Sequence, residues 1–131
     1  FAQGLKNLNI KFAWIVNSED GLDEISPYAK TNVMQLKDGH ISEITIDPKS
    51  LNINAEKFEN LIGNDAKFNA EKMIDIFKGK DNDFSKAVCL NAAAGLIVAE
   101  KFSEFSEAYN HIREHILSGK TFQYLEKIQN V

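Results

Sequence analysis

The stretch Phe12-Ala13-Trp14-Ile15-Val16-Asn17-Ser18 decides the fold class of this 131-residue chain. Residues 12–16 are apolar without a break, and polar residues follow at once. A short apolar run of this kind is typical of a β-strand buried on both faces, as in parallel sheets. Such a strand needs parallel neighbours on both sides, which the rest of the sequence does not obviously supply. We therefore predict an α/β fold and interpret the chain as the second half of an α/β domain.

The segments around this strand predict a helix before it and a hairpin after it. We expect residues 1–8 to form the tail of a crossover helix. Residues 32–37 and 40–46 are β-prone runs joined by Asp38-Gly39. Asp-Gly between two such runs favours a type I′ turn, because both turn positions need positive φ. Asp47-Pro48 then ends the second run.

The remaining sequence predicts four helices. The first covers residues 66–77, with Asp65 as its N-cap and Gly79 as its stop. We expect its buried face to consist of Ala66, Ala70, Met73, Ile74 and Phe77. The last two helices have apolar faces formed by Phe105, Ala108, Ile112 and Ile116, with Ser103 as a cap, and by Phe122, Leu125 and Ile128.

Between them lies a helix, residues 87–99, that is apolar except for Asn91 and Gly95. We expect it to be buried nearly all round, with its small residues 92–95 allowing close approach of a neighbour. Asn91 must find hydrogen-bond partners there. We expect it to tie the helix to a nearby loop, with ligand contact as the alternative. Cys89 has no activating base near it, which predicts a buried, inert thiol.

Composition excludes several classes of function. The net charge of −4 gives no basic footprint for nucleic acid or anionic membranes. No apolar run approaches the roughly 18–20 residues that span a bilayer. The chain begins with Phe1 and lacks a signal-peptide pattern, so we expect its native start to lie upstream. A single cysteine fits a reducing cytoplasm.

The loop after the first strand carries the candidate chemistry. Four of its residues are acidic: Glu19, Asp20, Asp23 and Glu24. Ligands usually bind at the carboxyl ends of strands in open α/β sheets. Hard carboxylates at such a place suit Mg²⁺, which keeps waters and substrate phosphates as its other ligands. Gly21 gives the loop freedom to turn. A solvated acidic loop is the alternative interpretation.

Residues 19–27, Glu-Asp-Gly-Leu-Asp-Glu-Ile-Ser-Pro, closely resemble a motif of the anthranilate phosphoribosyltransferases, where a Gly-Leu-Asp-Glu-Ile-Ser run follows a core strand. The resemblance continues in order along nearly the whole chain. Its further segments are Leu36-Lys37-Asp38-Gly39-His40-Ile41, Leu61-Ile62-Gly63-Asn64-Asp65-Ala66 with Asn69-Ala70, Leu90-Asn91-Ala92-Ala93-Ala94, and residues 116–125.

This resemblance implies a fold and a reaction. Residues 1–131 would be the carboxy-terminal half of the α/β domain shared with pyrimidine-nucleoside phosphorylases: a buried strand, a β-hairpin, then several helices. The family transfers phosphoribosyl from phosphoribosyl pyrophosphate to anthranilate in tryptophan synthesis. The matched Asp23 and Glu24 would bind the magnesium that holds the pyrophosphate. Because anthranilate supplies its own amine, the resemblance implies no catalytic nucleophile in this chain. It also identifies no substrate-binding residue here.

Other features of the family have no counterpart in this stretch. Its Gly-rich phosphate loop, a basic stretch, an anthranilate-binding Arg and an amino-terminal helical domain, through which it dimerises, all lie upstream. We therefore expect the segment to be inactive alone and the complete protein to be a homodimer. Asn17-Ser18 replaces a His-Gly pair, and Lys30-Thr31 replaces Pro-Thr. These departures leave open a related transferase or nucleoside phosphorylase with another acceptor, or a non-catalytic scaffold.

The helix near the end of the chain carries one further motif. His111-Ile112-Arg113-Glu114-His115 matches the H-x-x-E-H pattern of inverted zinc peptidases, with both imidazoles on one helix face. The match is short and lies in a charged helix, so we expect an exposed polar face without a metal role.

Overall fold

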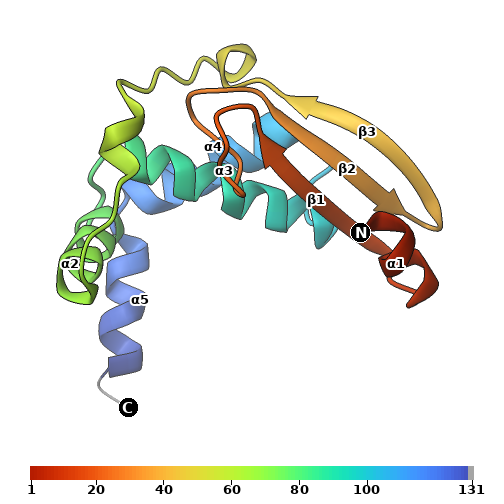
Figure 1. The fold of residues 1–131 in the computed structure, drawn as a ribbon. Coiled ribbons are helices and arrows are strands. Elements are labelled where there is room, and N and C mark those ends of the chain that lie inside the picture. The colour runs from red at the N-terminus through yellow and green to blue at the C-terminus, as the bar shows by residue number, and fades with distance from the viewer. Residues whose placement is uncertain (130–131) are drawn as a thin grey trace.

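A computed structural model describes residues 1–129 as a small sheet with helices packed against it. The strands are β1 Phe12–Ser18, β2 Thr31–Lys37 and β3 His40–Ile46. The helices are α1 Ala2–Asn7, α2 Ala66–Phe77, α3 Asp83–Val98, α4 Phe105–Leu117 and α5 Lys120–Gln129, with short 3-10 turns at Pro48–Leu51 and Phe58–Leu61. Helices α3 and α4 lie against the sheet, and α2 and α5 lie at the far end of the molecule (Figure 1).

The predicted hairpin is confirmed. Strands β2 and β3 pair antiparallel with Lys37 opposite His40, so the two residues between them form the turn. Asp38 and Gly39 both have positive φ, 47° and 78°, as a type I′ turn requires. This turn twists the same way as its strands, so the register of the hairpin is fixed locally.

The predicted parallel setting of the first strand is wrong for this chain. Strand β1 pairs antiparallel with β2, with Trp14 opposite Gln35, in the sheet order β1-β2-β3. Residues 12–16 are half-buried rather than buried on both faces, and within residues 1–129 the second edge of β1 has no strand partner. An apolar run reports burial and cannot report strand direction, which the returning loop sets here.

The core lies between the sheet and the long helices. Alternate residues of β1, namely Phe12, Trp14 and Val16, pack against it, and the Trp14 ring lies 5.8 Å from that of Phe105 at the start of α4. Leu36 is fully buried but is not a member of this core; it lies on β2, which α1 contacts. The members of the main core are Ile25, Val33, Ile46, Ile53, Ile76, Cys89, Leu90, Ala93, Ile97, Ala108, Tyr109 and Ile116.

Helix α2 has the predicted bounds but not the predicted buried face. Asp65 caps it by accepting a hydrogen bond from the Phe68 N–H (2.8 Å), and Gly79 follows it with φ of 96°. Its buried residue is Ile76, while Met73 is 54% exposed. The apolar residues of α2 form a broad stripe, and contacts with α3, α4 and α5 choose which part of it is covered.

Helix α3 begins four residues earlier than expected, because Asn82 and Ser85 form a capping box. Its inner side, which includes Leu90 and Ala93, is fully buried. Its outer side is not: Val88 is 38% exposed, and nothing lies within 4 Å of where a Gly95 side chain would begin. The expected burial all round is therefore not met by residues 1–129 themselves.

The start of α4 also corrects an expectation. Its N-cap residue is Glu104 rather than Ser103, and no side chain caps it.

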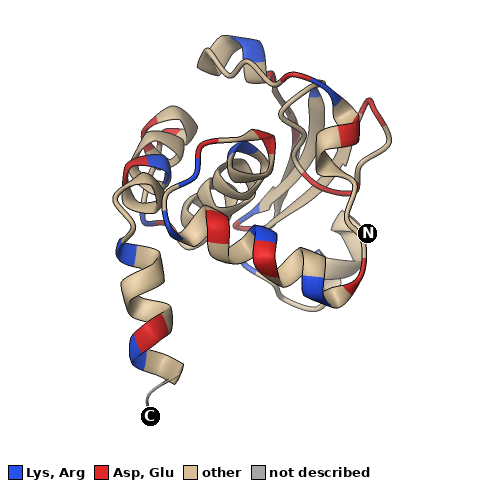
Figure 2. Cartoon of the chain, turned by 90° about the vertical axis from the view of Figure 1, so that its left-hand side faces the viewer, with Lys and Arg blue, Asp and Glu red and all other residues tan. Residues whose placement is uncertain are grey.

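Among residues 1–129, no helix is both long and apolar enough to cross a membrane. Basic and acidic residues are interspersed along the helices (Figure 2).

Candidate metal-binding loop

The loop between β1 and β2 has one exposed part and one buried part. Gly21, Asp23 and Glu24 are exposed, whereas Ile25 and Ser26 are completely buried. The chain therefore enters the core directly after Asp23 and Glu24, the two ligands predicted from the sequence. Because a buried segment has little freedom to move, the exposed pair projects from a fixed base.

Asp20 is exposed, and its carboxylate also holds the loop together. Its Oδ1 accepts a hydrogen bond from the Leu22 N–H (3.2 Å), and its Oδ2 accepts one from the Ser26 hydroxyl (2.5 Å). Partial burial alone would raise the pKa of Asp20, but the hydrogen bonds outweigh burial and hold that pKa below its ordinary value. Asp20 therefore remains charged to fold the loop.

Asn91 of α3 fastens the loop to the helix. Its Oδ1 accepts a hydrogen bond from the Ile25 N–H (2.9 Å), and its Nδ2 donates to the Ile25 carbonyl oxygen (3.1 Å). The same nitrogen lies 3.0 Å from the Ala87 carbonyl oxygen in its own helix. The prediction that Asn91 ties its helix to a neighbouring loop is thus confirmed.

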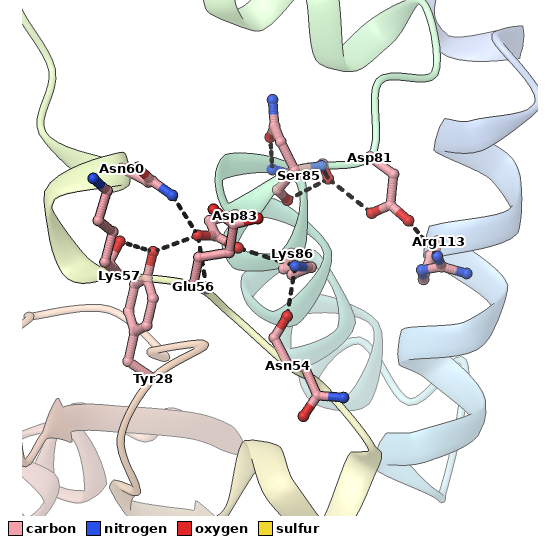
Figure 3. A network of polar contacts seen from close by, with 11 residues as sticks. Tyr28, Asn54, Glu56, Lys57, Asn60, Asp81, Asp83, Ser85, Lys86 and Arg113 are labelled. Carbon is pink, nitrogen blue, oxygen red and sulfur yellow. Dashed lines mark hydrogen bonds and ion pairs between the residues drawn. The ribbon is translucent and has the colours of Figure 1, made fainter.

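A second anchor, centred on Asp83, was missed at the level of sequence (Figure 3). Its Oδ2 accepts hydrogen bonds from Asn60 Nδ2 (2.8 Å), the Glu56 N–H (3.0 Å) and the Tyr28 hydroxyl (3.0 Å). Its Oδ1 lies 3.0 Å from Lys86 Nζ. The Tyr28 hydroxyl also contacts the Lys57 carbonyl oxygen. This carboxylate therefore joins the end of the acidic loop, residues 56–60 and the start of α3.

The surroundings of Asp83 keep it ionised. Burial by itself would raise its pKa, but hydrogen bonds from Asn60, Lys86 and the Glu56 N–H hold that pKa well below its usual range. Burial and the adjacent Asp83 charge raise the pKa of Tyr28, so its hydroxyl keeps its proton. The start of a helix also favours a negative charge. The capping pattern of Asn82 and Ser85 is a sequence signal that could have marked this helix start.

The predicted ligands Asp23 and Glu24 are adjacent and accessible. Within the described part of the chain, neither carboxylate takes part in a hydrogen bond or an ion pair. No group of three or more potential metal-binding side chains occurs in residues 1–129. Magnesium commonly uses one or two protein carboxylates and completes its shell with water and phosphate oxygens. The donor set of this loop therefore fits magnesium.

A hollow of about 510 Å³ lies beside the loop, between it and the outer side of α3. Glu24 and Leu22 line one side, and Phe84, Val88 and Ala92 line another. Its walls are mostly apolar. The exposed stripe of α3 thus continues directly to the base of the acidic pair.

Two stretches depart from the family motif, Asn17-Ser18 and Lys30-Thr31, although Thr31 itself matches the motif. Ser18 is buried, and its hydroxyl donates to the Lys30 carbonyl oxygen (3.2 Å). Thr31 is buried as well, and its Oγ1 accepts from the Ser26 N–H (3.1 Å). Asn17, in contrast, is exposed at the end of β1. Ser18 therefore serves the loop, and Asn17 is free to contact another molecule.

The remaining candidates lie apart from this loop. His111 and His115 are exposed on α4, as expected, and His111 packs against Phe102 with ring centres 5.1 Å apart. Cys89 is buried in the core, where burial raises the pKa of its thiol to about 11. A thiol with that pKa is protonated at neutral pH and unreactive, which agrees with the sequence interpretation.

Comparison with protein families gives one match that covers most of the chain. The model of the glycosyl transferase family, a/b domain, matches residues 1–122. Anthranilate phosphoribosyltransferase of Pelagibacter ubique (strain HTCC1062) is 76% identical over 131 residues, which are 100% of this chain and 40% of that protein. The chain thus spans well under half the length of this curated relative.

Solved structures give the same picture. Anthranilate phosphoribosyltransferase from Thermus thermophilus superposes with a TM-score of 0.84 at 25% identity, over 96% of this chain and 37% of that one. The Saccharomyces cerevisiae enzyme in complex with PRPP and Mg superposes with a TM-score of 0.74 at 23% identity, over 86% of this chain and 33% of that one. The second likeness concerns the fold alone. The α/β class predicted from the sequence is confirmed.

Proposed function

The chain belongs to the glycosyl transferase family through its a/b domain, and from this membership we propose that it is the carboxy-terminal part of an anthranilate phosphoribosyltransferase. The complete protein would transfer phosphoribosyl from phosphoribosyl pyrophosphate to anthranilate in tryptophan synthesis. The observation that carries the proposal is the pair Asp23 and Glu24, exposed and unpaired within the described residues, on a loop anchored at both ends.

In this proposal each part of the loop has a separate task. Asp23 and Glu24 would hold magnesium, which offsets the negative charge that gathers on the leaving pyrophosphate. Asp20 and Ser26 keep the loop folded, and Ile25 fixes it in the core. The acceptor would supply its own amine, so this chain would position the metal ion and would not have to supply a nucleophile.

We also propose that the rest of the active site lies in the part of the protein that this chain does not include. The chain spans 40% of the Pelagibacter ubique relative, and β1 has a free edge within residues 1–129. Parallel strands of the remainder would pair with that edge, and its phosphate-binding loop would face Asp23. A carboxylate pair without an opposing cradle of N–H groups holds pyrophosphate poorly. The segment alone would therefore be inactive.

Two further properties of the complete protein belong to the same proposal. A cytoplasmic location fits the single buried thiol, Cys89, which has no disulfide partner in the sequence. Dimerisation through an amino-terminal helical domain follows from the family resemblance.

A second candidate function is a related transferase with another acceptor. The exposed Asn17 favours it, because this side chain stands at the end of β1 where the family motif has a different residue. Assay of the complete protein with anthranilate and with other amines or nucleobases separates the two. Turnover of anthranilate supports the first function, turnover of another acceptor supports the second, and no turnover supports a scaffold.

Substitution of the acidic pair in the complete protein tests the site. Asp23→Asn and Glu24→Gln should each lower kcat/KM by about 10²-fold, which corresponds to about 3 kcal/mol of transition-state stabilisation. Glu19→Gln is the matched control, since Glu19 is acidic, exposed and on the same loop. Unchanged magnesium-dependent turnover in both variants would refute the metal assignment.

A further inference from the structure

Both the oxygen and the nitrogen of the Asn91 side-chain amide form hydrogen bonds with a single residue of the acidic loop. Its Oδ1 accepts from the Ile25 N–H, and its Nδ2 donates to the Ile25 carbonyl oxygen, at 2.9 and 3.1 Å. A polar side chain in an apolar helix costs stability unless its hydrogen bonds are satisfied. The loop satisfies the hydrogen bonds of Asn91, because the amide bonds to both the N–H and the carbonyl oxygen of Ile25. Two residues paired across a β-ladder bond in a similar way.

The geometry of this contact reaches Glu24 directly. The Ile25 N–H belongs to the peptide group that links Glu24 to Ile25, and a peptide group is planar. Holding that N–H therefore fixes the whole peptide plane and, with it, the direction in which the Glu24 side chain leaves the backbone. On the other side, Leu22 is held because its N–H donates to Asp20 and its carbonyl oxygen accepts from the Ser18 N–H (3.0 Å). The two carboxylate residues span the short gap between these anchors.

Other contacts already hold helix and loop in place. A capping box begins α3, and Leu90 and Ala93 are fully buried in the core. The Ile25 side chain is fully buried too, and the Asp83 network holds Tyr28 at the far end of the loop. Loss of the Asn91 amide should therefore leave the fold intact and loosen chiefly the residues next to Ile25.

Resting on the proposed function, we propose that Asn91 is a positioning residue for the metal-binding pair: it orients Asp23 and Glu24 through the Ile25 peptide without touching metal or substrate. Partners of metal ligands commonly change metal affinity or activity by about 10–100-fold when they are removed. The effect of Asn91 should therefore be seen in metal affinity before it is seen in stability.

The test measures Mn²⁺ binding to the complete protein by electron paramagnetic resonance of the free ion. Asn91→Ala should weaken Mn²⁺ binding about tenfold or more, raise the magnesium concentration for half-maximal rate, and speed hydrogen exchange of the Ile25 N–H. Asn91→Ser is the second variant, because its hydroxyl can still bond to the Ala87 carbonyl oxygen one turn back but cannot reach Ile25. It should show the same loss if Asn91→Ala does not fold.

Two reference variants make the outcomes distinguishable. Ala94→Gly weakens the same helix without touching the loop, and it should leave Mn²⁺ affinity unchanged. The double variant Asp23→Asn, Glu24→Gln should abolish binding, and if it does not, the metal site of the proposed function is wrong. If the double variant loses Mn²⁺ while both Asn91 variants bind it as tightly as the unaltered protein, the positioning role is overturned and the proposed function stands. An equal loss in Ala94→Gly would also overturn it.

Discussion

Carboxylates of this protein differ in the hydrogen-bond donors that surround them. Asp83 is 3% exposed, and Asn60, Lys86, Tyr28 and the Glu56 backbone donate to it, so its charge holds segments together. Asp20 does the same on a smaller scale within its loop. Asp23 and Glu24 are exposed and have no such donor among the described residues. Residue type alone does not separate the structural acids from the ligand candidates; the donors around each one do.

Replacing Asp83 tests this use of a buried charge. Asp83→Asn should lower the free energy of unfolding by about 2–3 kcal/mol at neutral pH, because hydrogen bonds to an ionised group are lost. The folded pKa is lowered, so the contribution is complete above the unfolded value of about 4 and is lost as pH falls below it. Urea unfolding at pH 7 and pH 3 should show a difference between variant and unaltered protein that shrinks at pH 3.

The control for this change is Asp75→Asn, which alters an exposed carboxylate paired with Lys80. It should have a much smaller effect at pH 7, because exposed ion pairs contribute little. An Asp83 variant as stable as the unaltered protein at neutral pH would contradict the anchoring role.

At the level of elements, short local signals set where the chain turns. The Asp38-Gly39 turn fixes the β2–β3 hairpin, Asp65 begins α2, and Gly79 ends it. Gly79 also touches a distant element: a Cβ there would lie 2.7 Å from the Leu117 carbonyl oxygen at the end of α4. This glycine therefore serves both the backbone turn and the packing of α2 on α4.

Gly79→Ala should destabilise the protein by about 2 kcal/mol or more, through positive φ and a clash with backbone that cannot move aside easily. Gly4→Ala is the matched control, because nothing lies within 4 Å of its Cβ position and Gly4 is inside α1. The control should be neutral or stabilising by up to about 1 kcal/mol. Thermal unfolding of the two variants checks both expectations, and equal midpoints would show that the contact with Leu117 is unimportant.

At the level of the whole molecule, a strand edge and part of a long apolar helix are left uncovered by residues 1–129. Strand β1 has a free edge within residues 1–129, and the outer side of α3 is exposed at Val88 and Gly95. A hollow of about 510 Å³ lies between Val88 and the acidic loop. The Thermus thermophilus enzyme, which this fold matches closely, is matched over 37% of its length. We propose that the rest of the protein covers these surfaces.

Gly95 gives a direct test of that cover. In residues 1–129 nothing lies within 4 Å of its Cβ position, so Gly95→Ala would favour the helix by about 1 kcal/mol if this face stayed open. In the complete protein we expect the opposite, a lower free energy of unfolding, because a close neighbour would meet the added methyl group. Denaturant unfolding of the complete variant decides between them. Stabilisation would mean that nothing packs there.

The free segment should associate through the same face. Open sheet edges and apolar patches drive self-association, so we expect sedimentation of the isolated 131-residue chain to show species larger than a monomer. Val88→Lys, which puts a charge into the exposed stripe, should reduce association. Ser106→Lys adds the same charge on the exposed surface of α4 and should not. A cooperative monomer that binds phosphoribosyl pyrophosphate tightly would contradict the division of the site proposed above.

The sequence by itself determined the local elements and the candidate pair. Turn chemistry at Asp38-Gly39, the cap at Asp65 and the acidic run ending at Glu24 each depend on neighbours in the chain, so they could be predicted from it. Tertiary structure alone decided the direction of β1, the side of α2 that is covered and the role of Asp83. Each of these depends on which distant residues arrive: β2 beside β1, α4 against Ile76, and Asn60 and Tyr28 around one carboxylate. Local periodicity does not predict these long-range contacts, because their packing free energy depends on segments that are far apart in the chain.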